Sequence, residues 1–414
     1  MTSLFSADSS EPITEWPRVA LGDVCTVVSG ATPKTKVPEF WDGDIVWITP
    51  TDLGKMDGQD ITESVRSISE AGFASCSTTL MEPGAVVMSS RAPIGHLGIA
   101  RVPLCTNQGC KSFVPGPDVD TDYLYYALRF SVPAIQDLGT GATFKEVSKS
   151  KLSRFQIPLP PLDVQREVAA TLRAQLELVS EARLHLEEQL AAAESLPEAY
   201  LTQAFRGIEA SRWPTVRLSE IADLIPARSL SRDGDTEVVA ATSACLTESG
   251  FSPDGLKAAR MDVASAAQAT LEPSEVLLAR SNTPELVGRA SLYEGDPTDV
   301  VASDLLIRVR VGPRAEPSYV GHYLSYLYLS GYWAERAGGA SGTMKKVRRT
   351  QVRAVEMTLP PLDVQRRVVD ALRQQQAGVR ALVSGLRAQA SAVEAMPGAF
   401  LQAAFAGVPT AVAA

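Results

Sequence analysis

An octapeptide that occurs twice constrains the folding of this 414-residue chain more than any other feature. Leu159-Pro-Pro-Leu-Asp-Val-Gln-Arg166 returns unchanged as Leu359-Pro-Pro-Leu-Asp-Val-Gln-Arg366, two hundred positions later. The match continues at the same offset on both sides, and Phe205, for example, returns as Phe405. Self-similarity at a fixed spacing indicates two copies of one structural unit. The blocks between the repeated parts diverge strongly. We therefore expect the repeated parts to be a shared scaffold and the divergent blocks to be two domains with different recognition properties.

Each copy of the octapeptide is predicted to open a long helix. Residues 163–205 contain one proline and no glycine, and Asp163 is a suitable residue for a helix start. Apolar residues recur seven apart in both copies, which is typical of a seam between paired helices. The predicted seam residues are Leu172, Val179, Leu186, Leu372, Val379, Leu386 and Val393.

The charges of the two helices favour pairing with each other. Residues 163–206 carry eight acids and four arginines, whereas residues 363–407 carry three acids and five arginines. We therefore expect an antiparallel coiled coil within the chain. At 1.5 Å per residue it would be a rod of roughly 60 Å that can hold two domains apart. The alternative is that each helix packs only on its own domain.

The divergent blocks alternate short β-like runs with turns and then become helical, in the first block over 122–130 and in the second over 319–333. Three tyrosines of the second stretch, Tyr319, Tyr323 and Tyr326, have helical spacing, for which a packing role is expected rather than base stacking. The predicted fold class is α+β, with two α/β domains separated by two long helices that form an antiparallel coiled coil, and with an internal pseudo-twofold repeat. The predicted boundaries are 1–158 for the first block, 159–207 for the first repeated helix, 208–358 for the second block, 359–407 for the second repeated helix and 408–414 for a tail.

Composition excludes several classes of protein. No apolar run approaches the roughly 20 residues of a membrane span, so a cytoplasmic protein without membrane contact is expected. The five cysteines do not combine with histidines at zinc-ligand spacing and are expected to be free thiols, mostly buried. Sequence motifs for a dinucleotide, a nucleoside triphosphate, a hydrolase nucleophile or a metalloprotease are absent. The chain is therefore predicted to be no enzyme and to need neither cofactor nor metal.

A net charge of −9 argues mildly against nucleic-acid binding, so the local distribution of charge decides. Basic residues gather just before each Pro-Pro step, without any acid over 336–353 and with only Glu146 interrupting the weaker first run. Cations near flexible glycine-rich segments are suited to DNA phosphates, although charge runs are commonly plain solvated surface. The predicted phosphate-binding residues are Lys145, Lys149, Lys151, Arg154, Lys345, Lys346, Arg348 and Arg349.

Reading bases requires forked donors or amides, because arginine can bind guanine and Asn or Gln can bind adenine through two hydrogen bonds. Such residues lie at β-like edges and turns of both blocks, where hydrogen bonding within the turn is the alternative role. The predicted base-reading candidates are Arg91, Asn107, Gln108 and Lys111 in the first block, and Arg280, Ser281 and Asn282 in the second.

This order of parts resembles the specificity subunits of type I restriction-modification systems. The resemblance rests on a divergent block, a Leu-Pro-Pro-Leu-x-x-Gln-Arg helix start, and the same unit again. Further motifs of the first block look like the target-recognition domains of that family, and the second block departs from them by having Ser303-Asp304 near the place of Asn107-Gln108. These motifs are Gly43-Asp44, Trp47-Ile48-Thr49-Pro50, Asp52-Leu53, Asn107-Gln108-Gly109 and Gly141-Ala142-Thr143-Phe144-Lys145.

The resemblance implies two target-recognition domains in inverted orientation, each reading one half of a split double-stranded DNA site, with the helices as a ruler for the spacer. It also implies partners: two modification subunits that bind S-adenosylmethionine and methylate adenine, and ATP-driven restriction subunits. A tandem protein-interaction scaffold in another phage-defence complex is the alternative, and a modification-only complex or an unrecognised nuclease are further ones. Salt-sensitive DNA binding would separate the recognition subunit from the scaffold.

Overall fold

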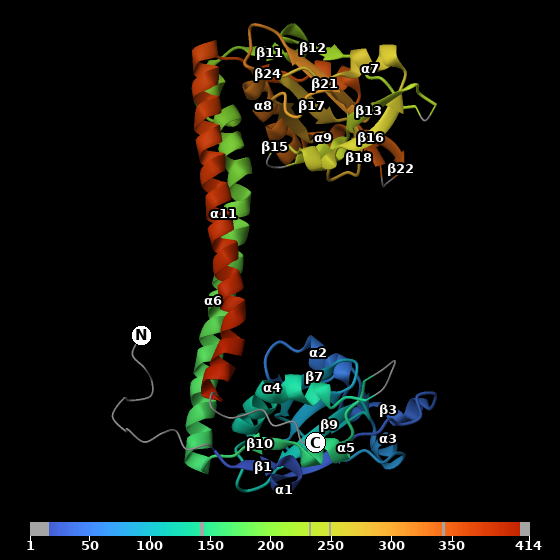
Figure 1. Cartoon of the computed structure of the whole chain (residues 1–414), viewed down its shortest axis with the longest axis vertical. Coiled ribbons are helices and arrows are strands. Elements are labelled where there is room, and N and C mark those ends of the chain that lie inside the picture. The colour runs from blue at the N-terminus through green and yellow to red at the C-terminus, as the bar shows by residue number, and fades with distance from the viewer. Residues whose placement is uncertain (1–15, 141–144, 232, 248–249, 342–343, 406–414) are drawn as a thin grey trace, which may run out of the picture. The chain divides into compact units, whose positions relative to one another are not determined.

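The computed structural model describes residues 16–140, 145–231, 233–247, 250–341 and 344–405 (Figure 1). The chain divides into two compact units. The first unit comprises Met1–His185 with Gln389–Ala414, and the second unit comprises Leu186–Ala388. Each unit contains one α/β block and parts of both long helices, α6 (Leu162–Arg206) and α11 (Leu362–Ala404).

The first block has a five-stranded sheet of order β2-β9-β6-β7-β4 and a three-stranded sheet of order β5-β3-β8. The strand β3 pairs in parallel with β8, and α4 packs against the larger sheet. A separate pair, β1 with β10, joins the two ends of the block. The strands are β1 (Arg18–Ala20), β2 (Cys25–Ser29), β3 (Trp41–Ile48), β4 (Asp60–Ile61), β5 (Ser67–Ile68), β6 (Val86–Ser90), β7 (Ile94–Ala100), β8 (Leu104–Thr106), β9 (Cys110–Pro115) and β10 (Gln156–Pro158), and the helices are α1 (Leu21–Val24), α2 (Pro50–Lys55), α3 (Glu70–Ala74), α4 (Thr121–Asp137) and α5 (Lys149–Arg154).

The second block repeats this plan with a four-stranded sheet of order β12-β21-β17-β19 and a three-stranded sheet of order β16-β13-β20. It adds the hairpin β14-β15 and the three strands β18-β23-β22, and β11 pairs with β24. The strands are β11 (Thr215–Arg217), β12 (Ala222–Ile225), β13 (Thr236–Ala241), β14 (Leu246–Thr247), β15 (Gly250–Phe251), β16 (Lys257–Met261), β17 (Glu275–Ala279), β18 (Ser281–Asn282), β19 (Ala290–Tyr293), β20 (Val300–Ala302), β21 (Leu306–Val311), β22 (Gly338–Ser341), β23 (Met344–Lys346) and β24 (Glu356–Thr358), and the helices are α7 (Val263–Ala269), α8 (Pro317–Leu329), α9 (Tyr332–Arg336) and α10 (Arg349–Arg353).

The central strand pairs of the two blocks have the same register. In the first block Ser89 faces Cys110 across β6 and β9, and in the second Ala279 faces Leu306 across β17 and β21. This pairing makes residues of the divergent blocks comparable one by one, although their sequences differ. The helical stretch expected over 319–333 is two helices, because Gly331 adopts a positive φ of 74° between α8 and α9.

The repeated octapeptide is held in the same way in both units. The buried Gln165 side chain donates hydrogen bonds to the carbonyl oxygens of Asp118 (3.0 Å) and Pro160 (2.8 Å), and its Oε1 accepts one from the Asp120 N–H (2.9 Å). The buried Gln365 side chain makes the equivalent set with Arg314, Pro360 and Glu316. The glutamine thus ties the start of each long helix to the loop before α4 or α8, since all three of its bonds are with backbone groups.

The ends of the long helices carry a repeated phenylalanine into an aromatic cluster. In the first unit Phe405 contacts Tyr123 and stacks on Phe130 at a centroid distance of 4.9 Å. In the second unit Phe205 packs against three tyrosines, at centroid distances of 5.3, 5.1 and 5.9 Å. These are Tyr319, Tyr323 and Tyr326, so the packing role expected for them is confirmed.

The two long helices run antiparallel within each unit. In the first unit the start of α6 shares a core with the end of α11, through Leu172 and Leu401 among others. In the second unit Arg387 of α11 donates to Glu194 of α6 at 2.9 Å, which joins the basic helix to the acidic one. The predicted fold class, two α/β blocks with two long antiparallel helices, is confirmed. The described helices include none that is both long and apolar enough to cross a membrane.

The predicted seam residues lie on the covered side of their helices. Leu172, Leu372, Val379 and Leu386 are buried, and Val179, Leu186 and Val393 are half-buried. Leu172 and Leu372 also belong to the cores of the adjacent blocks, because the first turns of each helix lie against a block as well as against the other helix. The division of the chain at the boundaries given above stays a prediction, because each compact unit takes up parts of both helices.

We expect Gln365→Met to lower the free energy of unfolding of the second unit by about 2–3 kcal/mol, because it leaves the buried carbonyl of Pro360 and two partly buried groups, the Glu316 N–H and the Arg314 carbonyl, without their partner. Urea unfolding measures the change. Gln375→Met, on the exposed side of α11, is the matched control and should stay within about 0.5 kcal/mol of the wild type. Equal stability of the two variants would contradict the role given to Gln365.

Candidate nucleic-acid interface

Three segments of the first block meet at one edge. The Ser90 N–H donates to the Gly109 carbonyl at 2.8 Å, and the Val147 N–H donates to the Ser90 carbonyl at 3.0 Å. These bonds join the turn 90–91, the loop 107–110 and the segment 145–147. We call this group of segments the three-segment edge of the first block. It unites the predicted base-reading turn with the start of the predicted phosphate-binding segment.

The second block has the same edge. The Arg280 N–H donates to the Leu305 carbonyl at 2.8 Å, and the Val347 N–H donates to the Arg280 carbonyl at 2.8 Å. The short strand β18 continues the contact, since Ser281 faces Lys346 and Asn282 faces Lys345 across β23. Residues 280–282, 303–305 and 345–347 therefore form the three-segment edge of the second block. Residues more than sixty positions apart meet there.

The predicted base-reading candidates of the first block differ in how exposed their side chains are and in whether these side chains are already bonded within the protein. Arg91 is half-buried, and its guanidinium lies 3.9 Å from the Glu146 carboxylate. Asn107 uses its Oδ1 within the turn, where it accepts from the Gly109 N–H at 2.8 Å. Gln108 is exposed and receives a hydrogen bond from the Thr32 hydroxyl at its Oε1. Arg91 and Gln108 thus remain the candidates that can face DNA.

The assignment of Lys111 to base reading is corrected by the structure. The residue is only 6% exposed, and its Nζ donates to the Gln108 carbonyl at 2.9 Å and to the Ser90 hydroxyl at 3.2 Å. Burial lowers the pKa of this ammonium, and the Glu146 carboxylate, 3.7 Å away, opposes that effect. Lys111 points into the protein because its β9 position faces the space beneath the three segments.

The candidates of the second block are all half-buried. Arg280 donates from Nη1 to the Asp304 carbonyl at 3.2 Å, and Asn282 accepts from the Thr283 N–H at 2.9 Å. Asp304 stands where the first block has Gln108, and the Ser229 hydroxyl contacts its carboxylate at 3.4 Å. A carboxylate at this position accepts hydrogen bonds where the Gln108 amide can also donate them, so the two edges offer different chemistry to a base.

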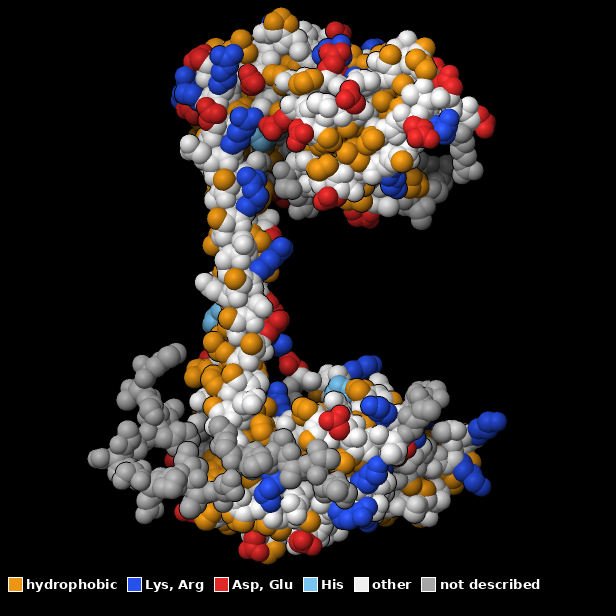
Figure 2. Space-filling view, in the orientation of Figure 1, with side chains coloured by type: hydrophobic (Ala, Val, Ile, Leu, Met, Phe, Trp, Pro, Cys, Tyr) orange, Lys and Arg blue, Asp and Glu red, His pale blue; other side chains and the backbone are white. Residues whose placement is uncertain are grey.

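Some of the predicted phosphate-binding residues are exposed and others are bonded within the protein, and Arg154 is both, because its Nε donates to the Ser150 carbonyl at 3.3 Å. Lys151 donates to the Leu138 carbonyl at 2.8 Å, Lys345 donates to the Ala334 carbonyl at 3.2 Å, and Arg349 donates to the Ile225 carbonyl. Burial, and then the nearby cations Arg280 and Arg353, lower the pKa of Arg349. The exposed members are Lys145, Lys149, Arg154, Lys346 and Arg348. On the face drawn in Figure 2, acidic and basic side chains of the second unit are interspersed, so total charge does not mark a DNA-binding face.

Sequence reasoning missed one loop of the first edge. Residues 30–36 approach the loop 107–110, because the Ala31 N–H donates to the Thr106 carbonyl at 3.0 Å and Thr32 contacts Gln108. A Cβ on Gly30 would come within 2.1 Å of the Thr106 carbonyl oxygen, so only glycine allows this approach. The cluster Ser29-Gly-Ala-Thr-Pro33 is a turn signal that could have indicated the loop. It brings two exposed cations, Lys34 and Lys36.

Some residues of the predicted DNA-binding motifs lie outside the described residues. The motif residues 141–144, and residues 342–343 of the second glycine-rich approach, belong to these segments. Among the residues that the structure does describe, no three His, Cys, Asp or Glu side chains gather in a way that could hold a metal ion. The five cysteines are free thiols, four of them buried and Cys76 half-buried. Burial raises the pKa of Cys25 and Cys110 to about 12, which makes these thiols poor nucleophiles.

Residues 13–188 match the family model of the type I restriction modification DNA specificity domain. The specificity domain so defined includes the whole first three-segment edge and the first half of α6. The resemblance to specificity subunits that the repeat suggested is therefore confirmed.

Curated relatives agree with this assignment. Over 160 residues the chain is 37% identical to the type I restriction enzyme MjaIX specificity subunit of Methanocaldococcus jannaschii, an alignment that covers 38% of this chain and 37% of that protein. Over 165 residues it is 27% identical to the EcoR124I/EcoR124II specificity subunit of Escherichia coli, covering 38% of this chain and 40% of that protein. The aligned segments thus span well under half the length of these relatives.

Solved structures extend the likeness in fold to nearly the whole chain. A chain from a study of complex assembly and conformational transition of the type I restriction-modification system has a TM-score of 0.72 at 21% identity, covering 96% of this chain and 100% of that one. The HsdS subunit from Thermoanaerobacter tengcongensis has a TM-score of 0.65 at 22% identity, with 97% and 99% covered. At these identities the comparison establishes the fold of both blocks and helices.

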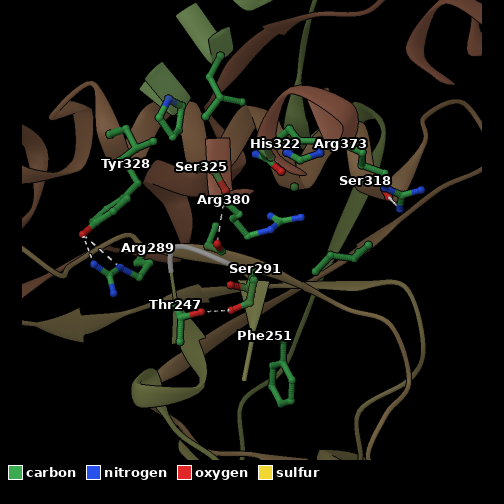
Figure 3. A pocket seen from close by; sticks show the side chains of 18 of the residues that line it. Thr247, Phe251, Arg289, Ser291, Ser318, His322, Ser325, Tyr328, Arg373 and Arg380 are labelled. Carbon is green, nitrogen blue, oxygen red and sulfur yellow. Dashed lines mark hydrogen bonds between the residues drawn. The ribbon is translucent and has the colours of Figure 1, made fainter. Parts of the chain in front are cut away.

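A separate cavity of about 780 Å³ lies in the second unit, between the second block and the helix pair (Figure 3). Arg373 of α11 donates there to the Ser318 hydroxyl at 3.0 Å and lies 3.6 Å from the Glu294 carboxylate. In the first unit Asp122 takes the place of Ser318 and binds Arg173, which forms an ion pair at the corresponding position. Burial, reinforced by Arg373, lowers the pKa of His322 in this cavity to about 4.

This depressed pKa predicts a pH dependence of stability. Between pH 6.5 and 4 the unfolded chain binds a proton at His322 that the folded chain does not, so the contribution of the neutral imidazole is complete above pH 6.5 and is lost as the pH falls toward 4. The loss amounts to roughly 3 kcal/mol. We expect His322→Gln to remove this component of the urea unfolding free energy across that window. His96→Gln, in the first unit, is the control, and an unchanged profile in His322→Gln would show that the imidazole is protonated without cost.

Proposed function

We propose that this chain is the non-catalytic DNA-recognition subunit of a type I restriction-modification complex, in which each block reads one half of a bipartite target. The observation that carries the proposal is the three-segment edge present in both blocks. Each edge brings predicted base-reading side chains next to exposed cations, which are the two kinds of group that sequence-specific DNA binding requires. The family of residues 13–188 supports the same function.

In this proposal the chain works in the cytoplasm and acts through partners. Two modification subunits methylate adenine, and restriction subunits join them in the full complex. The helices α6 and α11 dock the modification subunits and set the spacer between the half-sites. Chemistry belongs to the partners, which is why the chain needs positioning groups and no catalytic group of its own.

The proposal is tested by sequencing the methylome of a host that produces this chain together with its genomically adjacent methyltransferase. A strain that lacks only this chain is the comparison. Methyladenine in a two-part motif with a fixed gap is the expected result. An unchanged methylome in cells where the two proteins co-purify would instead favour a protein-interaction scaffold.

We expect the double variant Lys346→Gln/Arg348→Gln to weaken DNA binding by a similar factor for every sequence. If each side chain contacts one phosphate, the slope of log K against log salt falls by about 0.9 per contact. Fluorescence anisotropy over a range of salt concentrations measures the slope. Lys257→Gln, an exposed residue outside the three-segment edge, should leave the slope unchanged. A wild-type slope in the double variant would exclude these two residues from phosphate contact.

The proposed role of the helices predicts that removing seven residues from the middle of each helix shortens the spacer of the recognised target. Seven residues preserve the heptad register, so pairing should survive, and at 1.5 Å per residue the helices lose about 10 Å. Methylome sequencing measures the spacer. Both half-sites should be retained. The same spacer in the shortened protein would show that the helices do not set it.

A further inference from the structure

At each three-segment edge a cation donates to the equivalent backbone carbonyl. In the first block Lys111 Nζ donates to the Gln108 carbonyl at 2.9 Å, and in the second Arg280 Nη1 donates to the Asp304 carbonyl at 3.2 Å. Gln108 and Asp304 occupy equivalent positions, because Gly109 and Leu305, the residues that follow them, accept the equivalent backbone bonds from Ser90 and Arg280. In both blocks a positively charged side chain thus bonds the backbone of the loop residue, Gln108 or Asp304.

The two blocks supply this cation from different positions, Lys111 in β9 and Arg280 directly after β17. The register of β17 with β21 places Ile307 where the first block has Lys111, and Ile307 is fully buried. Conversely, Arg280 stands where the first block has Ser90, which is also fully buried. The hydrogen bond from a cation to this carbonyl is therefore present in both blocks, although the cation comes from a different position in each. If the bond to this carbonyl were only a by-product of packing, the second block would have no reason to make it with a different residue.

Lys111 reaches all three segments of its edge. Besides the Gln108 carbonyl it donates to the Ser90 hydroxyl at 3.2 Å, and the Glu146 carboxylate lies 3.7 Å away. Glu146 in turn lies 3.9 Å from the Arg91 guanidinium. A buried ammonium stabilises these orientations, because a small displacement of either acceptor would leave one of its charged donors without a partner in a site that excludes water.

We propose that Lys111 and Arg280 are positioning residues for sequence recognition, each fixing the base-reading loop of its own block. The proposal rests on the proposed function and deepens it. Neither residue touches a base: Lys111 sets the placement of Gln108 and Arg91, and Arg280 that of Asp304. Loss of the cation therefore reduces discrimination between bases in one half-site only.

The variant Lys111→Met tests this without removing the side-chain volume. Ile307 shows that an apolar side chain is accommodated at the same strand position, so the first block is expected to fold in this variant. Arg280→Met is the matching change in the second block. Lys55→Met removes the same charge at an exposed position of the first block and serves as the control.

The experiment is a selection from duplexes that carry two randomised half-sites, performed with the full chain and its methyltransferase. Wild type must first yield a bipartite motif, and its absence would count against the proposed function rather than this inference. The variants are then compared on single-base substitutions of that motif. We expect discrimination to fall by roughly tenfold per position in one half with Lys111→Met, and in the other half with Arg280→Met.

Two results would overturn the inference. One is unchanged preference in both halves. The other is a uniform loss of affinity for all sequences together with a lower melting temperature, which a merely structural role would produce. The control should leave the relative preference at both half-sites as in the wild type.

Discussion

The hydrogen bonds of Gln165 and Gln365 are the constraint on which the arrangement within each unit depends. Each side-chain amide bonds three backbone groups at the point where a block ends and a long helix begins, so the direction in which the helix leaves the block is determined. At the opposite ends of the helices, Phe205 and Phe405 enter aromatic clusters of a block. Because repeated residues anchor the ends of the helices, the remaining parts of the blocks are free to diverge.

The two blocks share one arrangement of central strands and differ in where they place charged side chains. Position 146 carries glutamate and position 346 lysine, and the buried cation moves from β9 in the first block to the turn after β17 in the second. The strand register is the same in both, so these changes alter the groups at the three-segment edges without altering the backbone that presents them. Two readers with different preferences can thus be made from one topology.

An acidic chain can perform this role because few cations are required when they are well placed. Four of the eight predicted phosphate-binding residues donate to backbone carbonyls within the protein, and the exposed Lys145 and Lys346 lie in the three-segment edges. The remaining surface is free to carry the acidic excess, much of which lies on α6, where Glu194 meets Arg387. The local placement of charged side chains therefore matters more here than the net charge of the chain.

The sequence by itself determined the two copies, the two long helices, their pairing and the resemblance to specificity subunits, because heptad spacing and an exact octapeptide repeat are local patterns that need no knowledge of contacts. It also predicted candidate base-reading and phosphate-binding residues. Only the tertiary structure decided which of them face outward: Lys111 and Gln108 are three positions apart, yet strand pairing buries the first and exposes the second. The contribution of residues 30–36 and the equivalence of Lys111 with Arg280 likewise depend on strand register, a long-range property that sequence spacing does not encode.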